Sequence, residues 1–350
     1  METKIYSVSN DAILSSILLE PASIIRNGGL VVFPTETVYG LGADATNPDA
    51  TSKIYAAKGR PSDNPLIIHI SDPKDAEQYA FTNSTYYSLA ESFMPGPLTV
   101  ILKAKDTVPL TTRGGLETVA VRCPENIIAR ELIRLSSVAI AAPSANLSGS
   151  PSPTSFEHAY SDMNGRVEAI IDGGDCDFGL ESTIVSIDDD GSITILRPGR
   201  ITKEDIEAIG LKVFVSDAVI NTLKDGEIAI SPGMKYKHYA PKAPVILLDG
   251  TKEQIAAYIK NNSSQEQKVA IIAYEDDADY IKDNVKDIVI YVFGSRTDEA
   301  TQAHLLFKLL RETDKDNYSV IYAPLPEKKG IGLALYNRMI RAAAHNIIRL

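Results

Sequence analysis

Several features that would assign this chain to a common protein class are missing from its sequence. It has only two cysteines, Cys123 and Cys176, which lie far apart and outside any CxxC pattern. This excludes a disulfide framework and a cysteine-rich zinc site. No apolar stretch approaches the ~20 residues that a membrane span requires, and the first residues lack the basic and apolar segments of a secretion signal. We therefore expect a cytoplasmic protein without membrane association.

Basic residues are also outnumbered by acidic ones, 35 against 46. The 350 residues carry a formal net charge of -11. Because affinity for a nucleic-acid backbone comes largely from lysine and arginine, we expect no stable complex with nucleic acid. Most of the excess acid lies before residue 244, so basic residues grouped in motifs there are informative. An acidic body with locally converging cations suits a small anionic ligand.

The familiar catalytic motifs are absent as well. The sequence has no GxxxxGK[ST] phosphate loop, no HExxH pair and no GxSxG nucleophile elbow. Its five histidines show no metal-ligand spacing, so we expect no dedicated metal site. Gly40, Gly42 and Ala45 match a GxGxxG/A spacing, but Pro48 delays the next helix. A tight turn is the better interpretation of these glycines than dinucleotide binding.

The length and the hydrophobic patterns predict two domains of α/β class. Residues 1–215 alternate short apolar runs with helical periodicities, and residues 245–350 alternate strand and helix at the short spacing of a Rossmann-like parallel sheet. Residues 216–244, which end in SPGMKYKHYAPKAP, predict an extended linker. In the first domain we expect strands over 30–33, 66–70, 98–102, 119–121, 138–141, 169–171 and 183–187, and helices over 50–57, 84–93 and 127–135.

Polar side chains that could bind a ligand follow several of these elements. Lys58 and Arg60 leave a predicted helix into a proline-fixed turn, where they could face phosphate oxygens or simply offset the helix dipole. We expect both to lie at phosphates and outside the core. Ser144 and Asn146 follow a strand at alternate positions, as also happens in ordinary turns.

Four further polar residues each lie at the end of a different apolar strand, and these are His69, Arg122, Ser182 and Arg197. One such residue means little. Several together are typical of the ligand crevice of an open α/β sheet.

Seven motifs in series carry a resemblance to a known family. They are PTETVYGLGADA, KGRPSDNPLIIHI, PGPLTVIL, TVAVRCP, AAPSANLSGSPSPT, ESTIVSI and LRPGRI. In this order they resemble the YrdC-like threonylcarbamoyl-AMP synthase family over residues 10–207. The linker and second domain resemble the long, two-domain form of that synthase. The resemblance implies a twisted open α/β sheet followed by a Rossmann-like domain. It also implies an enzyme that joins L-threonine, bicarbonate or carbon dioxide and the AMP part of ATP.

The resemblance further implies roles for individual residues. The catalytic KxR and SxN signature would be Lys58, Arg60, Ser144 and Asn146. The contacts to L-threonine would be Thr35, His69, Arg122, Ala142 and Ser182. The contacts to ATP would be Lys58, Ser62, Thr118, Ser144, Ser152 and Arg197, with Tyr236, His238 and Tyr239 from the linker. Mg²⁺ would accompany ATP without a dedicated protein site. The product would pass to a separate transferase that makes N6-threonylcarbamoyladenosine on tRNA.

Other functions fit parts of the same pattern. A concave basic surface could hold double-stranded RNA or tRNA without synthase activity, although the net charge disfavours RNA as the main ligand. Carbamoyl transfer in hydrogenase maturation uses related domains, but inside chains with cysteine-rich zinc modules that two isolated cysteines cannot form. The aromatic residues of the linker predict either a lid over the nucleotide or an anchor that joins the two domains.

Overall fold

Buried strands of the first part of the chain form one large mixed sheet in the computed structural model, which describes residues 1–8, 14–221, 239–264 and 266–350. Within these residues the sheet has twelve strands, in the order β1-β9-β2-β3-β8-β4-β7-β6-β10-β11-β12, and β5 pairs with β6. The strands are β1 Lys4–Ser7, β2 Val31–Phe33, β3 Gly40–Asp44, β4 Ile67–His69, β5 Ala80–Phe81, β6 Leu98–Ala104, β7 Thr118–Arg122, β8 Ile140–Ala141, β9 Ala169–Asp172, β10 Thr183–Ile187, β11 Ile193–Arg197 and β12 Val213–Val215. The predicted α/β sheet is therefore confirmed.

Helices cover this sheet on both faces. Along β2, Val31 and Phe33 pack in a cluster with α1 and α5, whereas Val32 packs in the larger cluster on the opposite face. This alternation follows from the two-residue period of a strand. The helices are α1 Leu14–Arg26, α2 Pro48–Lys58, α3 Ser84–Phe93, α4 Leu110–Arg113, α5 Ile127–Ser136, α6 Phe156–Met163 and α7 Lys203–Ala208, with short 3₁₀ turns at Pro73–Gln78 and Asp217–Val219.

Helix α2 carries the first signature lysine, and local sequence sets both of its ends. The Asn47 side chain accepts hydrogen bonds from the backbone N–H groups of Asp49 and Ala50, and proline occupies the first turn. The helix ends at Gly59, whose φ of 63° is a left-handed conformation that glycine adopts without strain. Lys58 is thereby fixed in the last turn.

The predicted tight turn at Gly40 and Gly42 is wrong, because both glycines lie in strand β3. A Cβ atom on Gly42 would lie 2.7 Å from the Phe33 ring and 2.7 Å from the Ile140 side chain. Glycine is present here because the Phe33 ring packs directly on the strand backbone.

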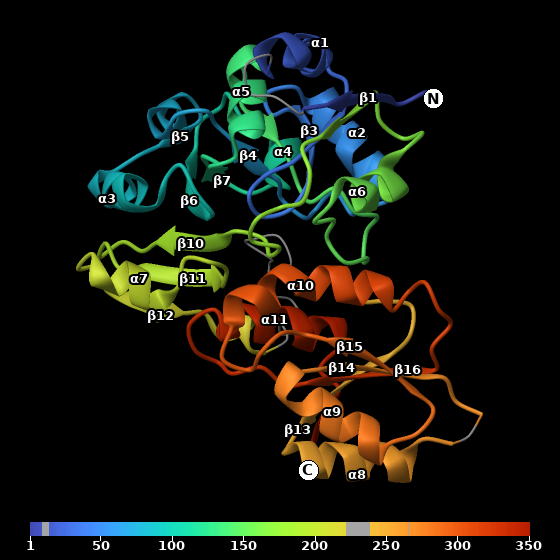
Figure 1. The fold of residues 1–350 in the computed structure, drawn as a ribbon. Helices are drawn as coiled ribbons and strands as arrows, with labels where there is room; N and C mark the ends of the chain where they lie inside the picture. The colour runs from blue at the N-terminus through green and yellow to red at the C-terminus, as the bar shows by residue number, and fades with distance from the viewer. Residues whose placement is uncertain (9–13, 222–238, 265) are drawn as a thin grey trace. The chain divides into compact units, whose positions relative to one another are not determined.

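The second compact unit contains residues 149–151 and the described residues from 239 onward. Its sheet is parallel at every described pairing, in the order β15-β14-β16-β13-β17. Helices α8 and α9 pack together, as do α10 and α11, as expected when right-handed crossovers cover both faces (Figure 1). The predicted Rossmann-like parallel sheet is confirmed. The elements are β13 Val245–Asp249, α8 Lys252–Asn262, β14 Val269–Ala273, α9 Glu275–Asn284, β15 Ile288–Val292, α10 Glu299–Glu312, β16 Val320–Pro324, α11 Gly332–Ala342 and β17 Ile347–Arg349.

None of the helices in the described ranges has both the length and the apolar character needed to cross a bilayer.

Candidate active site

A buried row of polar side chains crosses the otherwise apolar first sheet. His69 on β4 is in register with Arg122 on β7, and Arg122 is in register with Thr99 on β6. The Thr99 Oγ1 and Ser182 Oγ atoms are 2.8 Å apart, which extends the row to the start of β10. The structure thus brings together three of the predicted threonine contacts. It adds Thr99, a hydroxyl within the apolar run LTVIL that the sequence analysis missed.

Two nitrogen atoms in this row lack hydrogen-bond partners within the described part of the chain. They are Arg122 Nε and His69 Nδ1, both buried. The Nη2 atom of the same guanidinium already has a partner, because it donates to Glu36 Oε1 at 2.6 Å. Unsatisfied buried polar atoms are rare in native proteins and mark positions for a ligand or an ordered water. Neighbouring strands here carry two of them in register.

His69 is neutral at physiological pH in this environment. Burial, and next the positive charge of Arg122, lower its pKa from 6.5 to about 3. A neutral imidazole can exchange hydrogen bonds with an amino-acid ligand without adding charge beside Arg122. His69 therefore suits a hydrogen-bonding role and not that of a cation for phosphate.

The pKa of His69 predicts an acid-sensitive fold. Below pH 6.5 the unfolded chain binds a proton at His69 that the folded chain does not bind until about pH 3. The free energy of unfolding should therefore fall by up to about 1.4 kcal/mol per pH unit as pH drops through this range, and should gain nothing from His69 above it. Urea unfolding at several pH values should show a shallower dependence in His69→Gln. An equal pH dependence of the free energy of unfolding in the two proteins would contradict the lowered pKa of His69.

The other two predicted threonine contacts flank the row. Thr35 Oγ1 donates to Val38 O at 2.7 Å and accepts hydrogen bonds from the backbone N–H groups of Thr37 and Val38. This hydroxyl therefore stabilises the conformation of the loop after β2. Ala142 N donates to Ile67 O at 2.9 Å, which places it beside the strand that ends in His69.

The KxR and SxN signature residues meet only in part. Lys58 Nζ donates to Ser144 O and Asn146 O, each at 2.5 Å, and to Asn146 Oδ1 at 3.3 Å. Ser144 Oγ donates to Asn146 Oδ1 at 2.5 Å. Lys58 is only 3% exposed, so the expectation that it stands outside the packed interior is wrong. The segment that carries Ser144 and Asn146 also contacts the backbone of Lys58, because Ser148 N donates to Lys58 O at 2.9 Å.

Arg60 has a different environment from Lys58. Its Nη2 donates to Asn64 O at 3.3 Å and to Pro65 O at 3.1 Å, which braces the turn that contains the exposed Ser62. Thr118 begins β7 and Arg122 ends it. Four residue steps along the strand separate their Cα atoms by about 13 Å, so the predicted ATP contact at Thr118 and the predicted threonine contact at Arg122 lie at opposite ends of β7.

A direct contact joins the predicted threonine and ATP subsites. Arg197 donates through Nε to Ser182 O and through Nη2 to Ser182 Oγ, both at 3.1 Å. Ser152 Oγ donates to Glu181 Oε1 at 2.6 Å, and both side chains are buried. Sequence reasoning missed the buried carboxylates Glu36 and Glu181, although each lies inside a quoted motif.

Tyr236 and His238 lie outside the described residues, so their contacts to ATP stay predictions. Tyr239 is described and is buried within the second unit. Its ring stacks on Phe307 with a centroid separation of 5.1 Å, and the Arg338 guanidinium lies 5.9 Å from its centroid. This packing suits an anchor for the end of the linker, and a contact of Tyr239 with ATP stays a prediction.

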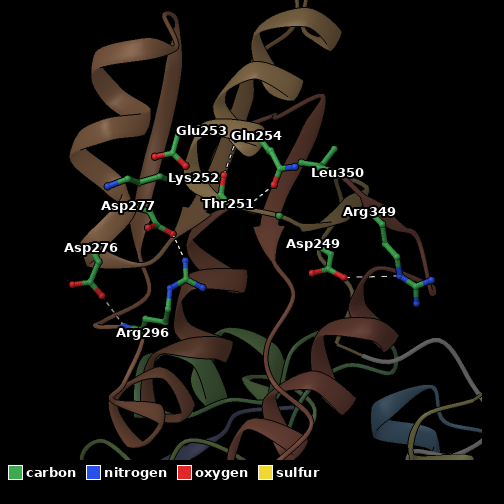
Figure 2. Close-up of a pocket in the computed structure, with 11 residues that line it drawn as sticks. Asp249, Thr251, Lys252, Glu253, Gln254, Asp276, Asp277, Arg296, Arg349 and Leu350 are labelled. Atoms are coloured by element: carbon green, nitrogen blue, oxygen red, sulfur yellow. Dashed lines mark hydrogen bonds and ion pairs between the residues drawn. The ribbon is translucent and has the colours of Figure 1, made fainter.

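The second unit has a crevice of about 680 Å³ at the carboxyl ends of β13 and β17, beside the first turns of α8 and α9. Figure 2 shows its arginines directed toward carboxylates. Arg296 pairs with Asp277 at 2.5 Å and Arg349 with Asp249 at 3.9 Å. Among the residues that the structure describes, none of the predicted substrate contacts lines this crevice.

Comparison with known proteins decides the family. A family model described as "Telomere recombination", covering the Sua5, YciO and YrdC proteins, matches residues 23–199, and one described as the C-terminal domain of threonylcarbamoyl-AMP synthase matches residues 201–344. The threonylcarbamoyl-AMP synthase of Bacillus subtilis is 44% identical over 335 residues, which cover 95% of this chain and 94% of the relative. This chain belongs to the threonylcarbamoyl-AMP synthase family. The resemblance inferred from the motifs is thereby confirmed, including its two-domain form.

A relative from Pyrococcus abyssi extends the match to a solved structure. The threonylcarbamoyl-AMP synthase of Pyrococcus abyssi is 42% identical over 338 residues, 94% of each chain. The crystal structure of P. abyssi Sua5 complexed with L-threonine matches with a TM-score of 0.90 and 39% identity over 100% of both chains. That relative binds L-threonine, and its fold is shared across this whole chain.

Proposed function

We propose that this protein makes threonylcarbamoyl-AMP and pyrophosphate from L-threonine, bicarbonate or carbon dioxide, and ATP. Membership of the synthase family supports this reaction. The observation in the structure that carries it is the pair of unsatisfied buried nitrogens on Arg122 and His69. They lie in the row that ends at the Ser182–Arg197 contact, where the two predicted subsites meet.

In the proposed reaction the protein mainly positions its substrates. The Arg122 guanidinium binds the α-carboxylate of threonine through charge-assisted hydrogen bonds. The neutral amine of threonine attacks carbon dioxide, which forms the new C–N bond, and the amine nitrogen releases one proton to water to give the carbamate. A carbamate oxygen then attacks the α-phosphorus of ATP, and the bond to pyrophosphate breaks. We propose that Arg197, which donates to Ser182 through Nε and Nη2, stabilises charge on the phosphate that reacts.

Mg²⁺ is proposed to enter with the triphosphate. The site offers hydroxyls and cations, and its two carboxylates accept hydrogen bonds from Arg122 and Ser152. Among the described residues, no group of three or more His, Cys, Asp or Glu is placed to hold a metal ion. This donor set fits an ion carried by phosphate oxygens, whose charge Mg²⁺ would partly neutralise.

The product is a mixed anhydride that water hydrolyses. A separate transferase must therefore take it up quickly. We propose that this partner transfers the threonylcarbamoyl group to adenosine of tRNA, and that the protein itself forms no stable complex with the nucleic acid.

Pyrophosphate release tests the proposed reaction. We expect release from ATP only when L-threonine and bicarbonate are both present, because the carbamate is the nucleophile. Serine should support slower release, since a pocket discriminates one methyl group by only ~1 to 3 kcal/mol. Equal release without any amino acid would refute the proposal. Salt-dependent tRNA binding with no threonine-dependent release would favour the RNA-binding alternative.

A further inference from the structure

Both carboxylate oxygens of Glu36 accept hydrogen bonds inside the first unit. Oε1 accepts from Arg122 Nη2 at 2.6 Å, and Oε2 accepts from Asn126 N at 3.4 Å, at the first turn of α5. The side chains of Glu36 and Arg122 are 7% and 5% exposed. This is a buried ion pair, in contrast to the exposed pair of Lys4 with Glu20.

The backbone that carries Glu36 is fixed on both sides. Phe178 N donates to Glu36 O at 2.8 Å, and Gly179 N donates to Thr37 O at 3.1 Å. Tyr39 follows in the same loop, and its hydroxyl donates to Gly174 O at 2.6 Å. These contacts leave the Glu36 carboxylate little freedom to move away from Arg122.

A buried ion pair is a weak source of stability, because desolvating two charges offsets much of their attraction. The Glu36–Arg122 pair also leaves the buried Arg122 Nε without a partner among the described residues, so this donor is available to a ligand. The arrangement is instead suited to orienting the Arg122 guanidinium toward a ligand. Glu36 neutralises the charge of this group and fixes its Nη2 atom in a hydrogen bond.

We infer that Glu36 is a positioning residue for the amino-acid subsite. It fixes Arg122 through Nη2 and keeps Nε for the α-carboxylate of L-threonine. This inference rests on the proposed function, since it takes Arg122 as the residue that binds the substrate carboxylate. Glu36 acts through Arg122 and is given no contact with the substrate.

Glu36→Gln is the sharpest test, because it keeps the size of the side chain. Glutamine has one oxygen and one NH₂ group, so in either orientation its NH₂ faces a donor, Arg122 Nη2 or Asn126 N. We expect the KM for threonine to rise about tenfold or more, with kcat falling less, because one lost charged hydrogen bond corresponds to roughly that factor. The affinity for ATP, measured without threonine, should stay within about twofold.

Two further variants separate positioning from folding. Glu20→Gln removes the carboxylate of the exposed pair and should leave all kinetic constants unchanged. The double variant Glu36→Gln with Arg122→Gln removes both buried charges. It should melt at a higher temperature than Glu36→Gln alone and still fail to use threonine.

The outcomes also distinguish this inference from the proposed function. If the unaltered protein shows no threonine-dependent pyrophosphate release, the proposed function fails. If the unaltered protein is active and Glu36→Gln keeps its threonine KM, the positioning role fails. A fall in melting temperature with equal losses in ATP and threonine binding would make Glu36 a structural residue only and would also overturn the inference.

Discussion

Arg122→Gln is expected to reduce kcat/KM for threonine by at least about 30-fold, because truncating one partner of a buried charged pair costs about 2–5 kcal/mol. The change removes the proposed partner of the substrate carboxylate and leaves the buried Glu36 carboxylate without its cation. Pyrophosphate release measured across threonine concentrations gives the constant. The affinity for ATP alone should change little, since the proposed contact is to the amino acid.

Arg134→Gln is the matched control for this variant. Arg134 also pairs with a glutamate at 2.6 Å, but its side chain is 61% exposed. Exposed pairs contribute little to stability, so this variant should behave as the unaltered protein. Threonine kinetics in Arg122→Gln that match those of Arg134→Gln would remove Arg122 from the substrate site.

Lys58→Ala should lower both activity and stability. The ammonium group donates to three acceptors of the SxN segment, two of them backbone carbonyls. Leaving buried acceptors unsatisfied costs about 1–3 kcal/mol each, so we expect the melting temperature to fall by several degrees. Turnover should fall further, because the segment carrying Ser144 and Asn146 loses its support.

Two other lysine variants show whether Lys58→Ala loses turnover directly or only through its loss of stability. Lys53→Ala, on the same helix, removes an exposed lysine that donates to Gly28 O and should preserve turnover. Lys58→Met keeps the apolar stem and should recover part of the melting temperature, but not ATP turnover. If Lys58→Ala lowers the melting temperature while its KM for ATP and its turnover stay normal, the signature lysine is structural and takes no part with the nucleotide.

Local elements of the fold were predictable because their signals are local. Helix α3 begins and ends as expected, at Ser84 and Phe93, since Asn83 caps it and the apolar period runs to its end. Strand β10 likewise has its predicted bounds. The parallel second sheet followed from the short alternation of strand and helix.

The arrangement across the first sheet could not be predicted in the same way. Strand order and register depend on contacts between distant segments, so the sequence does not reveal that Thr99 lies beside Arg122. Glu36 reaches Arg122 across 86 positions of the chain, and no local pattern pairs them. Burial of Lys58 was missed for the same reason, because its acceptors come from residues 144 and 146.

Identification of the nucleotide product tests the central claim most directly. The protein is incubated with ATP, L-threonine and bicarbonate labelled with carbon-13. The products are separated, and their masses are measured by mass spectrometry. We predict threonylcarbamoyl-AMP that carries the label in its carbamate carbon, formed together with pyrophosphate. Formation of ADP or of unlabelled AMP alone, with no threonine in any nucleotide product, would contradict it.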